Sequence, residues 1–101
     1  MAFIEKKVAV TIKFKAKKGK GKRLAKALSE AGAAKRVTEG CINYSVHRHA
    51  MDADLFVTHE VWENMEFMQK EVNAAHLGEF SKKHEGLLEK DPIPEIWELL
   101  T

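Results

Sequence analysis

The fold is decided by residues 41–62, which read CINYSVHRHAMDADLFVTHEVW. Apolar and polar side chains alternate over residues 41–48, and residues 55–62 are rich in β-branched and aromatic side chains, so both segments are predicted strands. The polar connection over residues 50–54 predicts a hairpin between them. An antiparallel strand pair therefore forms the centre of the predicted fold.

The residues before this hairpin predict a strand followed by a helix. Valine, isoleucine and phenylalanine alternate with smaller or charged side chains over residues 8–15, which is the pattern of a half-buried strand. Gly19 and Gly21 end that strand. Leucine and alanine then recur at helical spacing over residues 22–36, with lysine and glutamate on the opposite side.

The residues after the hairpin predict two helical segments and a final strand. Asn64 is a predicted helix N-cap, because its side-chain oxygen can accept from the free amides of the first turn. A break near residues 73–75 precedes a second helical stretch to Leu88, which the following prolines end. Residues 96–100 form a last strand or tail. The resulting β-α-β-β-α-β order predicts an α+β, ferredoxin-like fold with a single domain over residues 1–101.

This topology places both helices on one face of the sheet and leaves the other face free. Alternation assigns eight apolar residues to the helix-covered face: Val8, Val10, Ile12, Ile42, Tyr44, Val46, Val57 and Val61. The free face would then hold Phe56 and Trp62 among small uncharged side chains, with Lys13 and Glu60 at its margins. A solvated face in a chain that is 32% charged should carry more lysine and glutamate. We therefore predict that Trp62, Glu60 and Phe56 contact a second copy of the chain across a two-fold axis.

Charge is unevenly distributed along the chain. Residues 1–50 carry 13 Lys/Arg and 3 acids, net +10, whereas residues 51–101 carry 4 Lys and 12 acids, net −8. We expect the two halves to neutralise each other within the fold or across a dimer. The Lys-rich run over residues 13–23 contains no aromatic residue besides Phe14 for stacking on bases, so it predicts a solvated turn and no nucleic-acid partner.

No targeting or membrane-spanning signal is expected. The chain lacks a run of about 18 apolar residues, and residues 1–5 lead into the first strand pattern without a signal-peptide core. The single cysteine, Cys41, cannot form an internal disulfide, and no Cys/His spacing suggests a metal site. We therefore expect a cytoplasmic protein with no membrane partner.

Several short segments occur in the order and spacing of a known family. They are EGCINYSV at residues 39–46, EVW at residues 60–62 and AHL at residues 75–77, preceded by a Lys-Lys-Gly turn at residues 17–19. On these segments the chain resembles the antibiotic-biosynthesis monooxygenase family over nearly its whole length. The resemblance implies a homodimer whose two sheets close into an α/β barrel, with a pocket between sheet and helices in each protomer.

The resemblance also implies oxidation of a quinol, a phenol or a similar small aromatic compound by O₂ without a cofactor. Such chemistry is reasonable, because the anion of a phenol can pass one electron to O₂ directly inside a pocket that excludes water. The sequence contains no Gly-rich dinucleotide fingerprint. Haem-degrading relatives carry an Asn and a Trp at positions that correspond here to Ile12 and the vicinity of Lys70, so haem degradation is not expected.

Two histidines are the candidate catalytic residues. His76 matches the pocket histidine of the family, and histidine can accept or donate a proton at neutral pH. His59 is in phase with the apolar side chains predicted to face the helices, so it should face the same pocket and form an acid/base pair with His76. The predicted substrate contacts are Tyr44, Ile12, Met68 and Phe67.

Two other functions remain open from the sequence. The histidine pair could shuttle protons on a small carbonyl compound, which would make the protein an isomerase. Alternatively, the pocket could bind a small aromatic or anionic metabolite without catalysis. The substrate itself is not named by any feature of the sequence.

Overall fold

The computed structural model describes residues 6–101, and the expected lead-in over residues 1–5 lies outside them. The elements in chain order are β1 (Val8–Lys15), α2 (Gly21–Arg36), β2 (Cys41–Arg48), β3 (Leu55–Trp62), α3 (Met65–Glu71), α4 (Ala74–Lys83) and β4 (Pro94–Glu98). This order confirms the α+β, ferredoxin-like fold predicted from the sequence.

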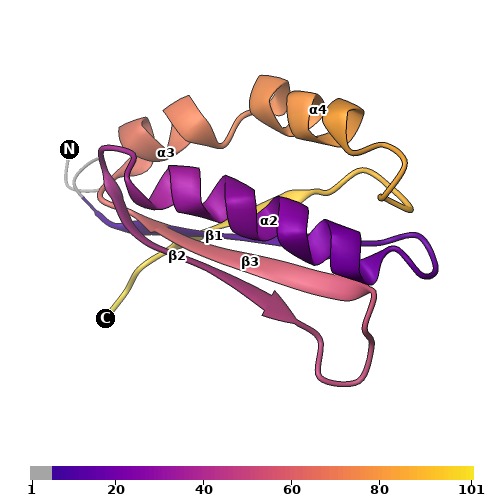
Figure 1. Cartoon of the computed structure of the whole chain (residues 1–101). Coiled ribbons are helices and arrows are strands. Elements are labelled where there is room, and N and C mark those ends of the chain that lie inside the picture. Colours follow the sequence, from indigo (N-terminus) through magenta and orange to yellow (C-terminus); the bar gives the residue numbers. More distant parts are fainter. Residues whose placement is uncertain (1–5) are drawn as a thin grey trace.

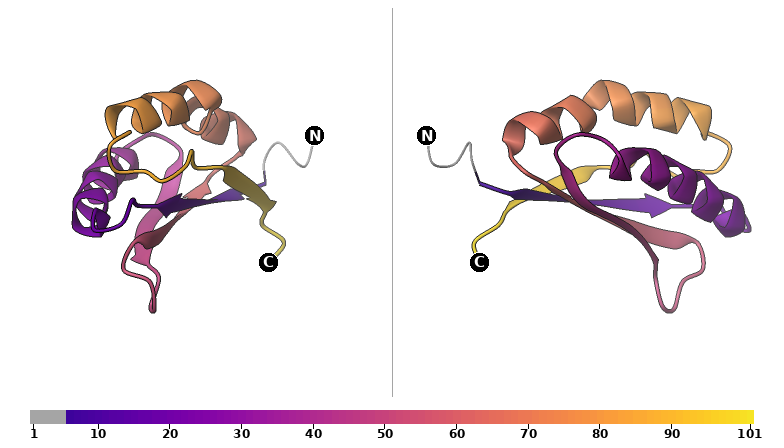
Figure 2. Two further views of the ribbon diagram at one scale, coloured as in Figure 1. Left: turned by 90° about the vertical axis from the view of Figure 1, so that its right-hand side faces the viewer. Right: turned by 60° about the vertical axis from the view of Figure 1, so that its left-hand side comes forward.

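The four strands form one antiparallel sheet in the order β2-β3-β1-β4. β1 and β3 lie at its centre. β3 is thus inserted between β1 and β2, which is the split βαβ arrangement predicted from the sequence. Figures 1 and 2 show all three helices above one face of this sheet and no helix on the other. We call the uncovered side the outer face. Within the described part of the chain, no helix is long and apolar enough to cross a membrane.

Two asparagines start the helices that follow the hairpin. The Asn64 side chain accepts a hydrogen bond from the Phe67 amide at 3.0 Å, which caps α3 as predicted. The Asn73 side chain accepts one from the His76 amide at 2.9 Å and caps α4. The helical region after the hairpin is therefore divided at Asn73, where the sequence indicates a break. Each of the two helices has its own cap, which satisfies an amide of the first turn that would otherwise lack a partner.

The end of α4 differs from the prediction. The helix was expected to reach Leu88, but it ends at Lys83. The following segment instead pairs with the end of β1: the Lys17 amide donates to the Leu87 carbonyl, and the Glu89 amide donates to the Lys15 carbonyl. These backbone bonds, formed 70 or more residues apart, replace those of a further helical turn.

The side-chain phase of β3 is the main correction to the sequence analysis. Val10 is paired with Glu60 and Phe14 with Phe56, so Phe56, Glu60 and Trp62 lie on the helix-covered face. All three are buried. The prediction that these three residues contact a second copy through the outer face is therefore wrong. Alternation gave the wrong answer because β3 carries apolar residues in both phases, and a glutamate in one phase made that phase resemble the solvated side.

The start of β2 also departs from simple alternation. The register shifts between Cys41 and Asn43, so that Cys41 is paired with Trp62 while Ile42 lies in the irregularity. Ile42 is consequently 46% exposed, although it was predicted to face the helices. A bulge inserts one extra residue and reverses the phase of everything before it. The prediction for Tyr44, which lies after the bulge, is correct.

Residues from every layer build the hydrophobic core. The core consists of Val8, Val10, Ile12, Phe14, Ala16, Leu24, Leu28, Phe56, Trp62, Met68, Val72 and Leu88. Because α2 supplies Leu24 and Leu28 while α3 supplies Met68, both helical regions are anchored on the same sheet face.

Three ion pairs connect the basic first half of the chain with the acidic second half. They are Lys6 with Glu98, Lys15 with Asp52, and Lys35 with Glu60. The first two have both side chains partly in water, where a pair contributes little. In the third, the carboxylate is buried, and this pair belongs to the candidate site described below.

One close contact fixes how α2 lies over β2. A Cβ atom at Gly32 would come 2.5 Å from the Tyr44 ring, whereas one at Gly78, in α4, would meet nothing within 4 Å. We expect Gly32→Ala to lower the free energy of unfolding by about 1–3 kcal/mol through overpacking. Gly78→Ala should raise it by about 0.5–1 kcal/mol through backbone entropy. Urea denaturation of both variants measures the difference, and a stabilised Gly32→Ala protein would contradict the close contact.

Candidate functional site

A cavity of about 210 Å³ lies between the sheet and the helices. Every layer contributes to its wall. The lining residues are Ile12, Phe14, Leu28, Ala31, Lys35, Tyr44, Thr58, Glu60, Glu71, His76, Leu77 and Phe80. The pocket implied by the family resemblance is therefore present, and it contains Tyr44, Ile12 and His76 among the predicted site residues.

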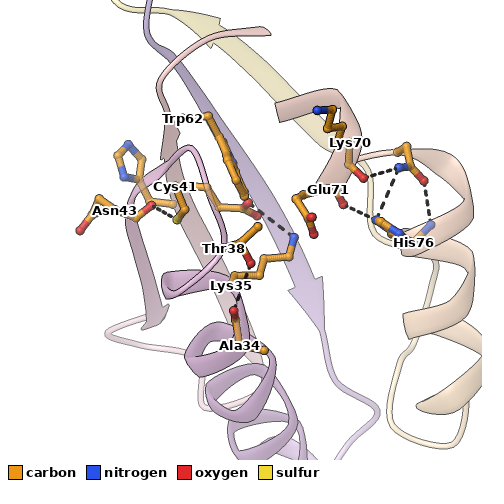
Figure 3. A network of polar contacts seen from close by, with 12 residues as sticks. Ala34, Lys35, Thr38, Cys41, Asn43, Trp62, Lys70, Glu71 and His76 are labelled. Atoms are coloured by element: carbon orange, nitrogen blue, oxygen red, sulfur yellow. Dashed lines mark hydrogen bonds and ion pairs between the residues drawn. The ribbon is translucent and has the colours of Figure 1, made fainter. Parts of the chain in front are cut away.

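Glu60 is the most unusual residue of this wall. Its side chain is only 1% exposed, although it is a carboxylate. The Trp62 indole N–H donates to Glu60 Oε1 at 3.1 Å, and the Lys35 ammonium lies 3.5 Å from the same oxygen. Figure 3 shows Lys35, from α2, and Trp62, from β3, joined to this network by dashed lines. One carboxylate oxygen is thus held by two donors from different layers.

The second oxygen of Glu60 is not held in this way. Within residues 6–101, Glu60 Oε2 is buried without a hydrogen-bond partner. Thr58 Oγ1 is buried too, close enough to the Tyr44 hydroxyl to lower the pKa of that group. Buried polar atoms almost always have partners, so each exception calls for an explanation. Because both residues line the cavity, these atoms are suited to bind a ligand there.

Burial raises the pKa of two residues in the wall. Desolvation raises the pKa of Glu60, against the opposing effects of the Lys35 charge and of the Trp62 hydrogen bond. Burial, with the nearby Glu60 charge, also raises the pKa of the Tyr44 hydroxyl. Glu60 is therefore a stronger proton acceptor than an ordinary carboxylate, while Tyr44 stays protonated at neutral pH.

His76 lies at the exposed rim of the cavity. Its Nδ1 atom is 2.8 Å from the Glu71 carbonyl oxygen, and the shortness of this contact assigns the ring proton to Nδ1. Nε2 is then left as a proton acceptor. Figure 3 shows His76 beside Glu71, across from Lys35. The predicted position of His76 at the pocket is confirmed.

His59 does not lie at this cavity. It is paired with Thr11 and Ser45 in a row of the outer face, on the opposite side of the sheet from His76. The predicted acid/base pair of His59 and His76 is therefore wrong. The same one-residue change of phase that buries Glu60 carries His59 away from the helices.

Two further predicted substrate contacts belong to the core. Met68 is fully buried in the hydrophobic cluster, and Phe67 packs beside it, close to Gly40. Neither contributes to the cavity wall. Methionine suits a pliable pocket wall, but it fills gaps in a core equally well, and here both side chains pack with the core.

A larger groove of about 690 Å³ lies between α4 and residues 85–94. Its charged residues, Lys82, Glu85 and Asp91, are all exposed to water. Exposed charges are solvated and gain little from a ligand. The smaller cavity, with its buried carboxylate, is therefore the better candidate for chemistry.

The cavity offers proton transfer in an apolar surrounding. Glu60 can take a proton, and the Lys35 ammonium can stabilise a negative charge that develops beside it. Phe14, Leu28 and Phe80 form the apolar part of the cavity wall. Over residues 6–101, His, Cys, Asp and Glu side chains do not gather in threes in a way that could hold a metal ion.

This combination of a ferredoxin-like sheet and a cavity under its helices defines a class of small α+β proteins with an enclosed site. Residues 7–83 match the family model described as antibiotic biosynthesis monooxygenase. The chain belongs to this family. No curated protein matches the sequence.

Solved structures confirm the fold. A protein from Pseudomonas aeruginosa superimposes with a TM-score of 0.82 at 23% identity, covering 97% of this chain and 98% of that chain. A Deinococcus radiodurans protein, described provisionally as an antibiotic biosynthesis monooxygenase, gives 0.79 at 20% identity, covering 93% of each chain. A Bacteroides thetaiotaomicron protein of unknown function, described as a possible oxidoreductase, gives 0.78 at 21% identity, covering 94% and 99%. At such identities these similarities concern the fold alone.

Sequence reasoning missed the polar centre of the site. Glu60 was assigned to a contact between copies, and Lys35 and Thr58 were not singled out. The available signal for a polar site was that Thr58 and Glu60 lie in the same phase of β3 as the large apolar residues Phe56 and Trp62. A buried charge needs a compensating partner, but the partner, Lys35, is 25 residues away and cannot be recognised by local periodicity.

The raised pKa of Glu60 predicts how stability depends on pH. Because the folded state favours the protonated carboxyl, its contribution is full below the unfolded pKa and is lost as pH rises through the raised folded pKa. Glutamine is uncharged throughout. We therefore expect the stability of Glu60→Gln relative to wild type to increase as the pH rises above the ordinary glutamate pKa of about 4.3, as measured by urea denaturation.

The exposed Glu63, at the end of the same strand, provides the matched control. Glu63→Gln should show no such trend. A difference between Glu60→Gln and wild type that stays constant with pH would contradict the burial of an ionisable group at this position.

Proposed function

We propose that this protein is a cofactor-independent monooxygenase that acts on a small hydroxylated aromatic compound, with Glu60 as the proton acceptor. One observation carries the proposal: a buried carboxylate with one unpartnered oxygen lines a cavity that also has aromatic and aliphatic walls, beside an ammonium group. Membership of the antibiotic biosynthesis monooxygenase family supports the reaction class.

The chemistry follows from the positions of these groups. Glu60 Oε2 removes the proton of a phenolic hydroxyl, and Lys35 stabilises the resulting anion. An electron-rich anion can transfer one electron to O₂ directly, and the apolar wall keeps water away while the two radicals combine. The oxygen–oxygen bond of the resulting ring hydroperoxide breaks with loss of water, so one oxygen atom stays on the ring as a carbonyl. The ring supplies all four electrons, because it loses two hydrogen atoms and becomes a quinone. His76 Nε2, at the rim, can exchange protons between the cavity and solvent.

Replacing the proton acceptor tests this proposal. Glu60→Gln keeps the shape and the acceptor for the Trp62 indole but removes the base, so kcat/KM should fall by about 10²–10⁴-fold. The matched control, Glu63→Gln, should retain wild-type activity. The assay is oxygen uptake with quinols and phenols, chosen after mass spectrometry of any compound that co-purifies. Full oxygen uptake by Glu60→Gln would contradict the assigned role.

A proton-shuttling isomerase of a small carbonyl compound is the second candidate. Glu60 and His76 place two proton-transfer groups on one cavity, which is the arrangement that such a reaction needs. Oxygen consumption separates the two functions, because an isomerase converts its substrate without using O₂.

We also propose that the outer face pairs with a second copy of the chain, as the family resemblance implies. With the corrected phase, its central strands present Ala9, Thr11, Val57, His59 and Val61, and the exposed Lys13 is paired with Val57. Trp97, on the neighbouring β4, lies in the same row as Ala9 and is 52% exposed. An extended face with so few charges supports an isologous contact.

A lysine in the centre of the outer face should disrupt this contact. Val61→Lys is expected to convert a dimer into a monomer, because the charge would be buried without a partner. Val37→Lys is the control, since Val37 is 86% exposed at the end of α2. Light scattering after size-exclusion chromatography measures the mass. A wild-type monomer, or a dimeric Val61→Lys protein, would contradict the proposal. Trp62, which lies in the core, is unsuitable for this test.

A further inference from the structure

The cavity wall carries an unequal number of charges. Lys35 is matched by Glu60, whose Oε1 atom lies 3.5 Å from the ammonium. Glu71, from α3, also lines the cavity and is close enough to raise the pKa of Glu60 further. Arg36 does not compensate, because its Nε–H donates to the Tyr44 carbonyl oxygen and its side chain is not part of the wall. The wall therefore has an excess of negative charge.

The polar atoms of the residues that line the cavity are mainly hydrogen-bond acceptors. Glu60 Oε2 and the Glu71 carboxylate can only accept when ionised, and His76 Nε2 accepts in the tautomer assigned above. The Thr58 hydroxyl can act either way. Figure 3 shows Glu71 lying between Lys35 and His76, and Glu71 is half-buried. A ligand that supplies O–H or N–H donors satisfies these atoms, whereas a carboxylate or phosphate supplies none and is repelled.

The size of the cavity restricts the ligand further. An engineered protein cavity of about 150 Å³ binds benzene, so a cavity of about 210 Å³ suits one ring with a few substituents. The rings of Phe14 and Phe80, which lie edge to face with centroids 5.5 Å apart, form one side of it. Such walls favour a flat aromatic compound.

We propose that the cavity takes an uncharged single-ring compound with O–H or N–H donors, and that Glu71 excludes compounds bearing a carboxylate or phosphate. This inference rests on the proposed function, because it takes the same cavity as the substrate site. Glu71 acts here as a specificity residue in the cavity wall, and Glu60 remains the proton acceptor.

Two probes that differ by a single charge test the inference. Hydroquinone and 2,5-dihydroxybenzoate share the ring and both hydroxyls, but only the second carries a carboxylate. By anaerobic calorimetric titration, wild-type protein should bind hydroquinone at least about tenfold more tightly, and Glu71→Gln should reduce this preference by about tenfold. Glu66→Gln is the control, because Glu66 is exposed on the same helix, outside the cavity.

The wild-type protein provides a second test that does not depend on the folding of a variant. The preference for hydroquinone should decrease with added salt, because the mouth of the cavity is open to screening ions. Equal binding of the two probes, binding of neither, or a preference unchanged by both salt and Glu71→Gln would overturn the inference. Selective binding of hydroquinone without oxygen uptake would leave it standing and instead refute the proposed monooxygenase function.

Discussion

The buried contact between Glu60 and Lys35 constrains the rest of the structure. A carboxylate that is 1% exposed loses most of its hydration, which is costly unless donors replace it. The Trp62 indole comes from the same strand, but the ammonium comes from the last turn of α2. That turn must therefore lie above β3. Gly32 permits this placement, because any side chain there would meet the Tyr44 ring.

The same constraint creates the site. Lys35 holds only one oxygen of Glu60, and the other has no partner, on a residue that lines the space between the sheet and helices α2 and α4. A second donor from the protein would stabilise the fold but would remove the free acceptor that proton transfer needs. The incomplete hydrogen bonding of Glu60 is thus a cost in stability that is consistent with binding a ligand. Polar groups of this kind are concentrated at functional sites because a packed core has no use for them.

The local features of the fold could be predicted from sequence, and the direction of one strand's side chains could not. The ranges of β1, β2 and β3, the cap at Asn64 and the break near Asn73 agree with the structure because periodicity and capping act over a few residues. The phase of β3 failed because Glu60 resembles a surface residue until its partner on α2 is known. Tyr44, Ile12 and His76 were placed correctly at the pocket. His59 was not, for the same reason as Glu60.

The correction to β3 exchanges the residues of the two faces without making the outer face more polar. Val57 and Val61 replace Phe56 and Trp62 there, and Thr11 and His59 are its central polar side chains. The expected shortage of charge thus remains, although the residues that produce it differ. Because the charged site lies under the helices and the proposed contact between copies lies on the opposite face, a change such as Val61→Lys alters a side chain that is not part of the cavity wall. The dependence of activity on assembly can therefore be measured separately from the chemistry of Glu60.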